Sequence, residues 1–159
     1  FGPSFDYYAI RERRRELVRE RLAQYGLEKK PGVEETLRFL RAKGIKTAVA
    51  TATALDITKS HLTTIGVYDL FDSIVSAKNV AHGKPEPDVY LYACEQIGER
   101  PQDCMAVEDS PNGIMAAYRA GLRTVMVPDL TQPDEELTKY LYACVNSLSD
   151  LCELVDKED

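Results

Sequence analysis

The 159-residue sequence predicts an α/β fold built around a doubly wound parallel sheet. Short apolar runs, which suit buried strands, alternate along the chain with segments whose apolar residues recur at helical spacing. Gly26, Gly44, Gly66 and Gly121 follow expected helices, where a left-handed residue ends a helix at low cost. Regular alternation of strands and helices is typical of a parallel sheet that helices cover.

The first half of the chain contains three expected helices and two expected strands. Residues 6–24 predict a helix that is dense in charge and carries only a thin apolar stripe, so most of its surface should face solvent. A connector at residues 29–32 precedes a helix over residues 33–43, a strand over 45–50, a helix over 56–65 and a strand over 71–76.

The second half continues the alternation. A helix is expected over residues 88–97, with Val89, Tyr92, Ala93 and Ile97 on its apolar face. A buried strand at residues 105–107 leads into a helix that begins at Ser110-Pro111 and carries a stripe of Ile114, Ala117 and Tyr118. A strand over 123–127, a helix over 134–141, a short strand over 143–145 and a last helix follow, and the last helix begins at a capping-box pattern from Ser147 to Asp150.

Composition excludes several classes of function. A net charge of −6 and a pI near 5.0 argue against nucleic acid as a partner, because phosphate backbones require a basic surface. No apolar run approaches the ~18 residues that a membrane span needs. The four cysteines show no paired spacing and predict core thiols in a reducing cytoplasm. His61 and His82 are isolated and receive no role.

Three polar sites are expected at one edge of the sheet. Thr51 and Ala52 follow the strand over residues 45–50, Lys84 lies where a loop enters a helix, and Glu108 and Asp109 end the strand over 105–107. Open α/β sheets bind ligands at the carboxyl ends of their strands. A hydroxyl, backbone amides, one ammonium and a carboxylate that can hold Mg²⁺ are the groups that a phosphoryl group requires.

Three motifs resemble the haloacid dehalogenase superfamily and, within it, the β-phosphoglucomutase-like phosphatases. They read Ala-Val-Ala-Thr-Ala-Thr at residues 48–53, Gly-Lys-Pro-Glu-Pro-Asp at 83–88 and Val-Glu-Asp-Ser-Pro-Asn-Gly at 107–113. The resemblance extends from about Pro31 to the C-terminus. It implies a Rossmann-like core over residues 31–159, preceded at residues 1–30 by a connector and the last helix of a helical cap.

The resemblance also implies a role for each matching residue. Thr51, with Ala52 and the amides that follow, would hold the phosphoryl oxygens, and Lys84 would neutralise an aspartyl-phosphate intermediate. Asp109 would bind the Mg²⁺ cofactor directly, and Glu108 would act at the metal or just beside it. Ser110 and Asn112 would support the metal site, Asn112 through a metal-bound water.

The nucleophile of the resembled family, an Asp-x-Asp segment after a first strand, has no counterpart in this sequence. Asp6 follows no apolar strand and leads into the Arg-rich helix, so it is rejected. We expect that the central strand, between the strands over 45–50 and 105–107, comes from a missing N-terminal segment or a swapped neighbour. The chain would then be a truncated part of a larger protein and inactive alone.

Four functions compete at this point. The leading prediction is a cytoplasmic, Mg²⁺-dependent phosphatase that acts on a small phosphorylated metabolite. A β-phosphoglucomutase-type phosphomutase differs mainly in cap residues. A phosphoacceptor receiver module uses similar groups, but there the acids precede the Thr and Lys, which is the reverse of the order here. A catalytically silent interaction domain is the remaining alternative, and neither nucleic acid nor a membrane is expected as a partner.

Overall fold

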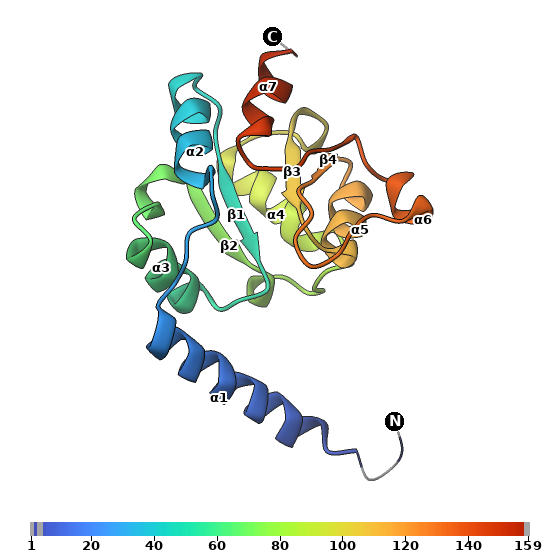
Figure 1. Ribbon diagram of the computed structural model, residues 1–159. Helices are drawn as coiled ribbons and strands as arrows, with labels where there is room; N and C mark the ends of the chain where they lie inside the picture. The colour runs from blue at the N-terminus through green and yellow to red at the C-terminus, as the bar shows by residue number, and fades with distance from the viewer. Residues whose placement is uncertain (1, 3–4, 158–159) are drawn as a thin grey trace.

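The computed structural model describes residues 2 and 5–157 and contains two parallel sheets (Figure 1). In the first sheet β1 (Ala48–Thr51) pairs with β2 (Ser73–Ser76). In the second, β4 (Arg123–Met126) lies between β3 (Met105–Glu108) and β5 (Ala143–Cys144). The predicted α/β class with parallel strands is therefore confirmed.

The helices follow the predicted order, with small differences at their ends. They are α1 (Tyr7–Tyr25), α2 (Val33–Ala42), α3 (Leu55–Thr64), α4 (Asp88–Ile97), α5 (Pro111–Arg119), α6 (Glu135–Thr138) and α7 (Asp150–Asp156). Short 3₁₀ helices lie at Tyr68–Leu70, Ala77–Asn79 and Pro101–Asp103. The predicted strand over 45–50 begins only at Ala48, and the helix predicted over 134–141 is a single turn at α6.

Local side-chain chemistry sets the helix ends. The Asp6 carboxylate accepts a hydrogen bond from the Ala9 amide at 2.9 Å, so the residue rejected as a nucleophile caps α1. Ser147 and Asp150 bond each other's backbone amides, at 3.3 and 3.0 Å, in the predicted capping box before α7. Gly121, at φ 83°, lies just beyond the end of α5.

Helix α4 packs against both strands of the first sheet and also against α5, which packs on β3 and β4. Their contact places Val89, Ala93 and Cys94 of α4 in one core cluster with Ala116 and Ala117 of α5. The two sheets are therefore joined through a pair of helices.

At two positions the buried face of a helix differs from the face that the sequence predicts. Tyr90 is buried on α4, whereas the predicted Tyr92 is only partly buried. Tyr118 is exposed, and its ring packs edge-on against Tyr140 with centroids 4.9 Å apart. Tyr118 therefore contacts the turn after α6 and lies outside the core stripe of α5.

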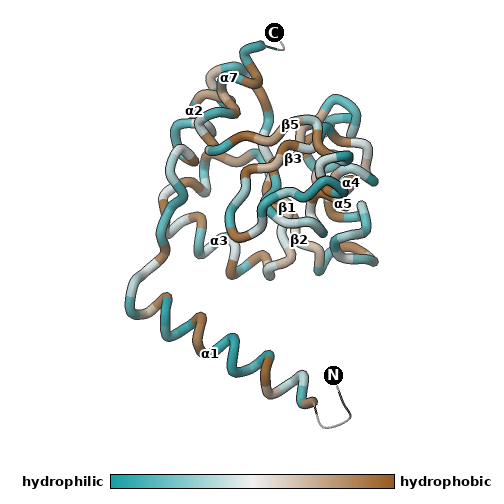
Figure 2. The backbone as a smooth tube through the Cα atoms, turned by 45° about the vertical axis from the view of Figure 1, so that its right-hand side comes forward, coloured by the Kyte–Doolittle hydropathy of each residue, from teal (hydrophilic) through white to brown (hydrophobic). Residues whose placement is uncertain are grey.

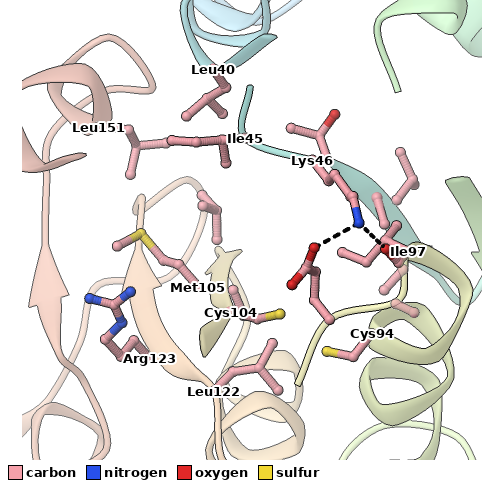
Figure 3. A pocket seen from close by; sticks show the side chains of 18 of the residues that line it. Leu40, Ile45, Lys46, Cys94, Ile97, Cys104, Met105, Leu122, Arg123 and Leu151 are labelled. Atoms are coloured by element: carbon pink, nitrogen blue, oxygen red, sulfur yellow. Dashed lines mark hydrogen bonds and ion pairs between the residues drawn. The ribbon is translucent and has the colours of Figure 1, made fainter. Parts of the chain in front are cut away.

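The facing edges of the two sheets, β1 and β3, do not pair with each other within the described residues. A cavity of about 1000 Å³ separates them and is lined by both strands and by α2, α4 and α7. Protein interiors rarely contain voids much larger than a water molecule. Figure 3 shows Leu40 and Leu151 on the opposite side of this cavity from Cys94 and Leu122.

The cavity corrects one prediction. Val107 of β3 was expected in a buried strand, but 42% of its surface is exposed. Val107 lines the cavity, where no described residue covers it.

Helix α1 extends away from the rest of the molecule (Figure 1), and none of its residues is buried. Apolar and hydrophilic residues alternate along it (Figure 2). The prediction that most of this helix faces solvent is therefore confirmed. No helix within the described residues is long and apolar enough to cross a membrane.

The four cysteines are free and differ in burial. Cys94 is buried, Cys104 and Cys152 are half-buried, and Cys144 is exposed on the edge strand β5. The pKa of the Cys94 thiol is raised to about 12, mainly by burial and secondly by a hydrogen bond with Cys104. The prediction of core thiols is thus wrong for Cys144.

Candidate active site

Lys84 connects the carboxyl ends of the two sheets. Its ammonium donates to the backbone carbonyl of Ala50 at 3.1 Å, one residue before Thr51, and to the Glu108 carboxylate at 2.5 Å, one residue before Asp109. The Lys84 side chain is 15% exposed and that of Glu108 is 8% exposed. The three predicted sites, at Thr51, Lys84 and Asp109, are therefore neighbours at one edge of the molecule.

The Glu108 carboxylate is fully engaged. One oxygen accepts from Lys84 and from the Tyr90 hydroxyl, and the other accepts from the Ser110 hydroxyl at 3.1 Å and from the Asp109 and Ser110 amides. Burial by itself would raise the pKa of Glu108. The charge of Lys84 and the hydrogen bonds from Lys84, Tyr90 and Ser110 outweigh it and lower this pKa below its usual value.

Asp109 differs from its neighbour. It follows β3, its side chain is exposed, and among the described residues its carboxylate forms no hydrogen bond or ion pair. Its negative charge contributes to the raised pKa of Tyr90, after burial and Glu108, so the Asp109 carboxylate lies close to the cluster. Of the two predicted metal ligands, Asp109 therefore has the more available oxygens.

The donor set fits Mg²⁺ only in part. Within residues 2 and 5–157, no three His, Cys, Asp or Glu side chains are grouped closely enough to hold a metal ion. Mg²⁺ is often bound through one or two carboxylates with several waters and a substrate phosphate. Asp109 meets that requirement as a single protein ligand, so further oxygens would have to come from outside these residues.

The turn after β1 is held in place by hydroxyl groups. The Thr51 hydroxyl oxygen accepts from the Thr53 amide at 3.0 Å, and buried Ser76 at the end of β2 donates to the Thr53 carbonyl at 2.7 Å. Thr51 thus stabilises its own turn, as capping chemistry alone would predict. The Thr51 hydroxyl hydrogen has no acceptor among the described residues, so it remains available to a ligand.

The first turn of α5 supports Glu108 from the other side. Ser110 caps this helix by accepting from the Gly113 amide at 3.2 Å while its hydroxyl donates to Glu108. A methyl group built at buried Gly113 would collide with the Glu108 carboxylate. The structure does not bring Asn112 into this cluster, because Asn112 is exposed and its side chain bonds no described residue.

Tyr90 is the site residue that sequence reasoning missed. Its hydroxyl donates to Glu108 at 2.5 Å and accepts from Lys84 at 3.2 Å. Burial, and then the charge of Glu108, raise the pKa of Tyr90 above its usual value, so the phenol keeps its proton. In the sequence, Tyr90 could be linked to the site only by its position six residues after Lys84. The apolar pattern predicted for α4 placed Tyr92 on the buried face instead.

The same architecture occurs in known proteins. Residues 5–121 match the family model described as haloacid dehalogenase-like hydrolase. The chain is 36% identical over 156 residues to the probable pseudouridine-5'-phosphatase of Drosophila melanogaster, covering 92% of this chain and 64% of that protein. It is 35% identical over 128 residues to the putative phosphatase YhcW of Bacillus subtilis, covering 80% of this chain and 57% of that protein.

A solved structure shares the fold. The chain superposes on a putative β-phosphoglucomutase from Thermotoga maritima with a TM-score of 0.81 and 26% identity, covering 97% of this chain and 71% of that chain. The chain spans 57 to 64% of the length of the two curated relatives. The family match, which covers most of the sequence and all three motifs, shows that the chain belongs to the haloacid dehalogenase-like hydrolase family.

Proposed function

We propose that this chain forms most of a Mg²⁺-dependent phosphatase that acts on a small phosphorylated metabolite. The observation that carries the proposal is the pair of contacts from Lys84 to Ala50 and Glu108, which sets the Thr51 turn beside Asp109. The names of the two relatives, both phosphatases, support the same reaction class.

In this proposal each site residue contacts a different part of the phosphoryl group. The Thr51 hydroxyl and the Ala52 amide donate to two phosphoryl oxygens, and the Lys84 ammonium offsets the charge that develops on the transferred group. Asp109 holds the Mg²⁺, which supplies further charge neutralisation when bound. Glu108 keeps Lys84 in position, and Ser110 keeps Glu108 in position. Asn112 is left with a supporting role through a metal-bound water.

The nucleophile belongs, in this proposal, to a strand that fills the cavity between β1 and β3. That strand would end beside Lys84, so a carboxylate at its end would face the phosphoryl group. Attack by this Asp forms an oxygen–phosphorus bond and breaks the bond to the leaving alcohol, which takes a proton from a second Asp. Water then gives a proton back to the second Asp and attacks the phosphorus, and the bond from phosphorus to the first Asp breaks, which releases phosphate and restores both Asp side chains. An upstream segment or a swapped neighbouring copy could supply the strand, with residues 1–30 as cap and connector and residues 31–159 as core.

A phosphomutase is the second candidate, because the chain shares its fold with a protein named as a putative β-phosphoglucomutase. A silent interaction domain is the third candidate.

The free cysteines support a cytoplasmic location, since such thiols persist under reducing conditions.

The test uses the chain joined at its N-terminus to the Asp-bearing strand that this proposal places in the cavity. Phosphate release from p-nitrophenyl phosphate is measured with Mg²⁺ and with a chelator. We expect turnover that needs Mg²⁺ and that falls at least about 100-fold in Asp109→Asn. Asp103→Asn is the matched control, because Asp103 precedes β3, is exposed and, among the described residues, has a side chain that pairs only with Arg100.

The outcomes separate the three candidates. Turnover that survives chelation and Asp109→Asn contradicts the metal-dependent phosphatase. Interconversion of glucose 1-phosphate and glucose 6-phosphate identifies the mutase, and no turnover of either substrate class identifies the silent domain.

A further inference from the structure

Tyr90 lies between the two charges that hold the site together. The residue is 7% exposed, and its hydroxyl both donates to Glu108 at 2.5 Å and accepts from Lys84 at 3.2 Å. The Lys84 ammonium also lies 4.7 Å from the centre of the Tyr90 ring. One side chain of α4 therefore contacts both members of the ion pair.

The donor count on Lys84 shows what any bound anion must replace. An ammonium group has three N–H donors, and all three have acceptors, namely the Ala50 carbonyl, the Glu108 carboxylate and the Tyr90 hydroxyl. A phosphoryl oxygen can bind Lys84 fully only if one of these acceptors gives way.

The three acceptors differ in how readily they can be released. Separating Lys84 from Glu108 would leave a half-buried charge without its counter-ion, which is costly. The Ala50 carbonyl belongs to the backbone of β1 and is fixed by the sheet. The Tyr90 hydroxyl is neutral, lies farthest from the ammonium and keeps a hydrogen bond to Glu108 after Lys84 leaves it.

We propose that Tyr90 is a positioning residue whose hydroxyl is the acceptor that Lys84 exchanges for a phosphoryl oxygen. The inference rests on the phosphatase function proposed above. While the ammonium turns toward the phosphoryl group, the Tyr90 hydroxyl continues to donate to Glu108 and keeps that carboxylate in place. Without the hydroxyl, the ammonium is drawn fully onto Glu108 and less of its charge reaches the transferred group.

The test is the kinetics of Tyr90→Phe in the chain joined to the strand proposed above, with p-nitrophenyl phosphate as substrate. Because less of the Lys84 charge reaches the transferred group in the transition state, we expect kcat to fall about tenfold while KM changes less than about threefold. Tyr92→Phe is the matched control on the same helix, because the Tyr92 hydroxyl has no partner among the described residues. Its kcat should match wild type, and thermal midpoints are recorded for all variants.

Lys84→Ala separates this inference from the proposed function. If Lys84→Ala retains normal turnover, or wild type has none, the proposed site is wrong and the role of Tyr90 is wrong with it. If Lys84→Ala abolishes turnover while Tyr90→Phe keeps kcat within twofold of wild type, only the role of Tyr90 is wrong. A loss of kcat in Tyr90→Phe that disappears at temperatures well below its thermal midpoint also overturns the inference, because it shows a structural role alone.

Discussion

At Gly113 the first turn of α5 passes directly over the Glu108 carboxylate, and there is no room for a side chain between them. The Glu108 carboxylate is held by Lys84, Tyr90 and Ser110, so it cannot move aside without breaking hydrogen bonds. A single missing Cβ atom therefore allows the helix and the acidic turn to approach each other.

Gly113→Ala should destabilise the protein by about 1–3 kcal/mol through overpacking. Helix propensity alone would predict the opposite sign, since Ala is favoured over Gly inside helices. Urea unfolding of Gly113→Ala and of Gly83→Ala, where an added methyl group meets nothing within 4 Å, measures the difference. Equal stability of Gly113→Ala and wild type would show that Glu108 is free to move.

Glu108 should also give the protein a specific acid sensitivity. Its pKa is lowered in the folded protein, so its stabilising contribution is complete above the ordinary carboxyl value of 4.5 and is lost as the pH falls through the folded value. Glu108→Gln should therefore cost about 1–3 kcal/mol at pH 7 and progressively less below about pH 4.5.

Unfolding free energies of wild type and Glu108→Gln between pH 3 and pH 7 measure this effect, with exposed Glu95→Gln as the control. A stability difference that stays constant across this range would contradict the assignment of Glu108 as the ionised partner of Lys84.

Much of the site was predictable at the residue scale because phosphoryl chemistry restricts residue types at strand ends. Thr51, Lys84 and Asp109 could be named from their motifs and from the expected edge of the sheet. Tyr90 could not, because helical periodicity identifies a buried face but not a hydroxyl that reaches past that face. The role of Asn112 stays a prediction, because its motif position says nothing of where its side chain points.

At the scale of elements, α4 and α1 are the two extremes in how much of a helix is buried. Helix α4 packs on both strands of the first sheet and on α5, which itself packs on the second sheet. It carries the buried Tyr90, Ala93 and Cys94. Helix α1 has no buried residue, and its charged side chains pair within the helix, as Arg13 does with Glu16 at 3.1 Å. Exposed pairs of this kind contribute little to stability.

Removal of residues 1–26 should therefore leave the thermal midpoint of the remaining chain within about 2 °C of the intact chain, a change of less than about 1 kcal/mol. Differential scanning calorimetry of the two proteins tests this expectation. Conversion of Ala93 to Asp on α4 is the opposite case and should prevent folding, because it buries an unpaired charge. A large drop in the midpoint after removal of residues 1–26 would show that α1 packs on the core.

Element types were predictable because apolar periodicity differs between strands and helices, but strand starts were not. Residues 45–47 were predicted as the start of this strand but lie outside β1, where the Thr47 amide donates to the Asp72 carboxylate at 2.7 Å. Side-chain bonds of this kind depend on tertiary neighbours that a local pattern cannot reveal.

At the scale of the whole molecule, the cavity between β1 and β3 leaves apolar surface and two strand edges uncovered by the described residues. Two strand edges and apolar residues of three helices face a space of about 1000 Å³. Strand edges and apolar walls of this kind bind extended segments readily and promote aggregation when left uncovered.

Filling the cavity with an added strand of the proposed kind should raise the thermal midpoint by about 5–10 °C, because binding at 100 times Kd contributes about 2.7 kcal/mol. The same strand should suppress the fluorescence of the dye ANS, which binds exposed apolar surface. A strand with proline at its centre is the control, since proline cannot donate to the ladder. Equal midpoints with and without the strand would refute the proposed occupant.

The position of Lys84 has a consequence for how variants of this protein would be scored. One ammonium group binds a carbonyl on the first sheet and a carboxylate on the second, so it supports the assembly of the two halves as well as the chemistry proposed between them. A genetic screen that counts only how much protein accumulates in cells would therefore single out position 84 as strongly as a screen for product. Abundance data alone would therefore classify Lys84 as a structural residue and would miss its proposed role in the reaction.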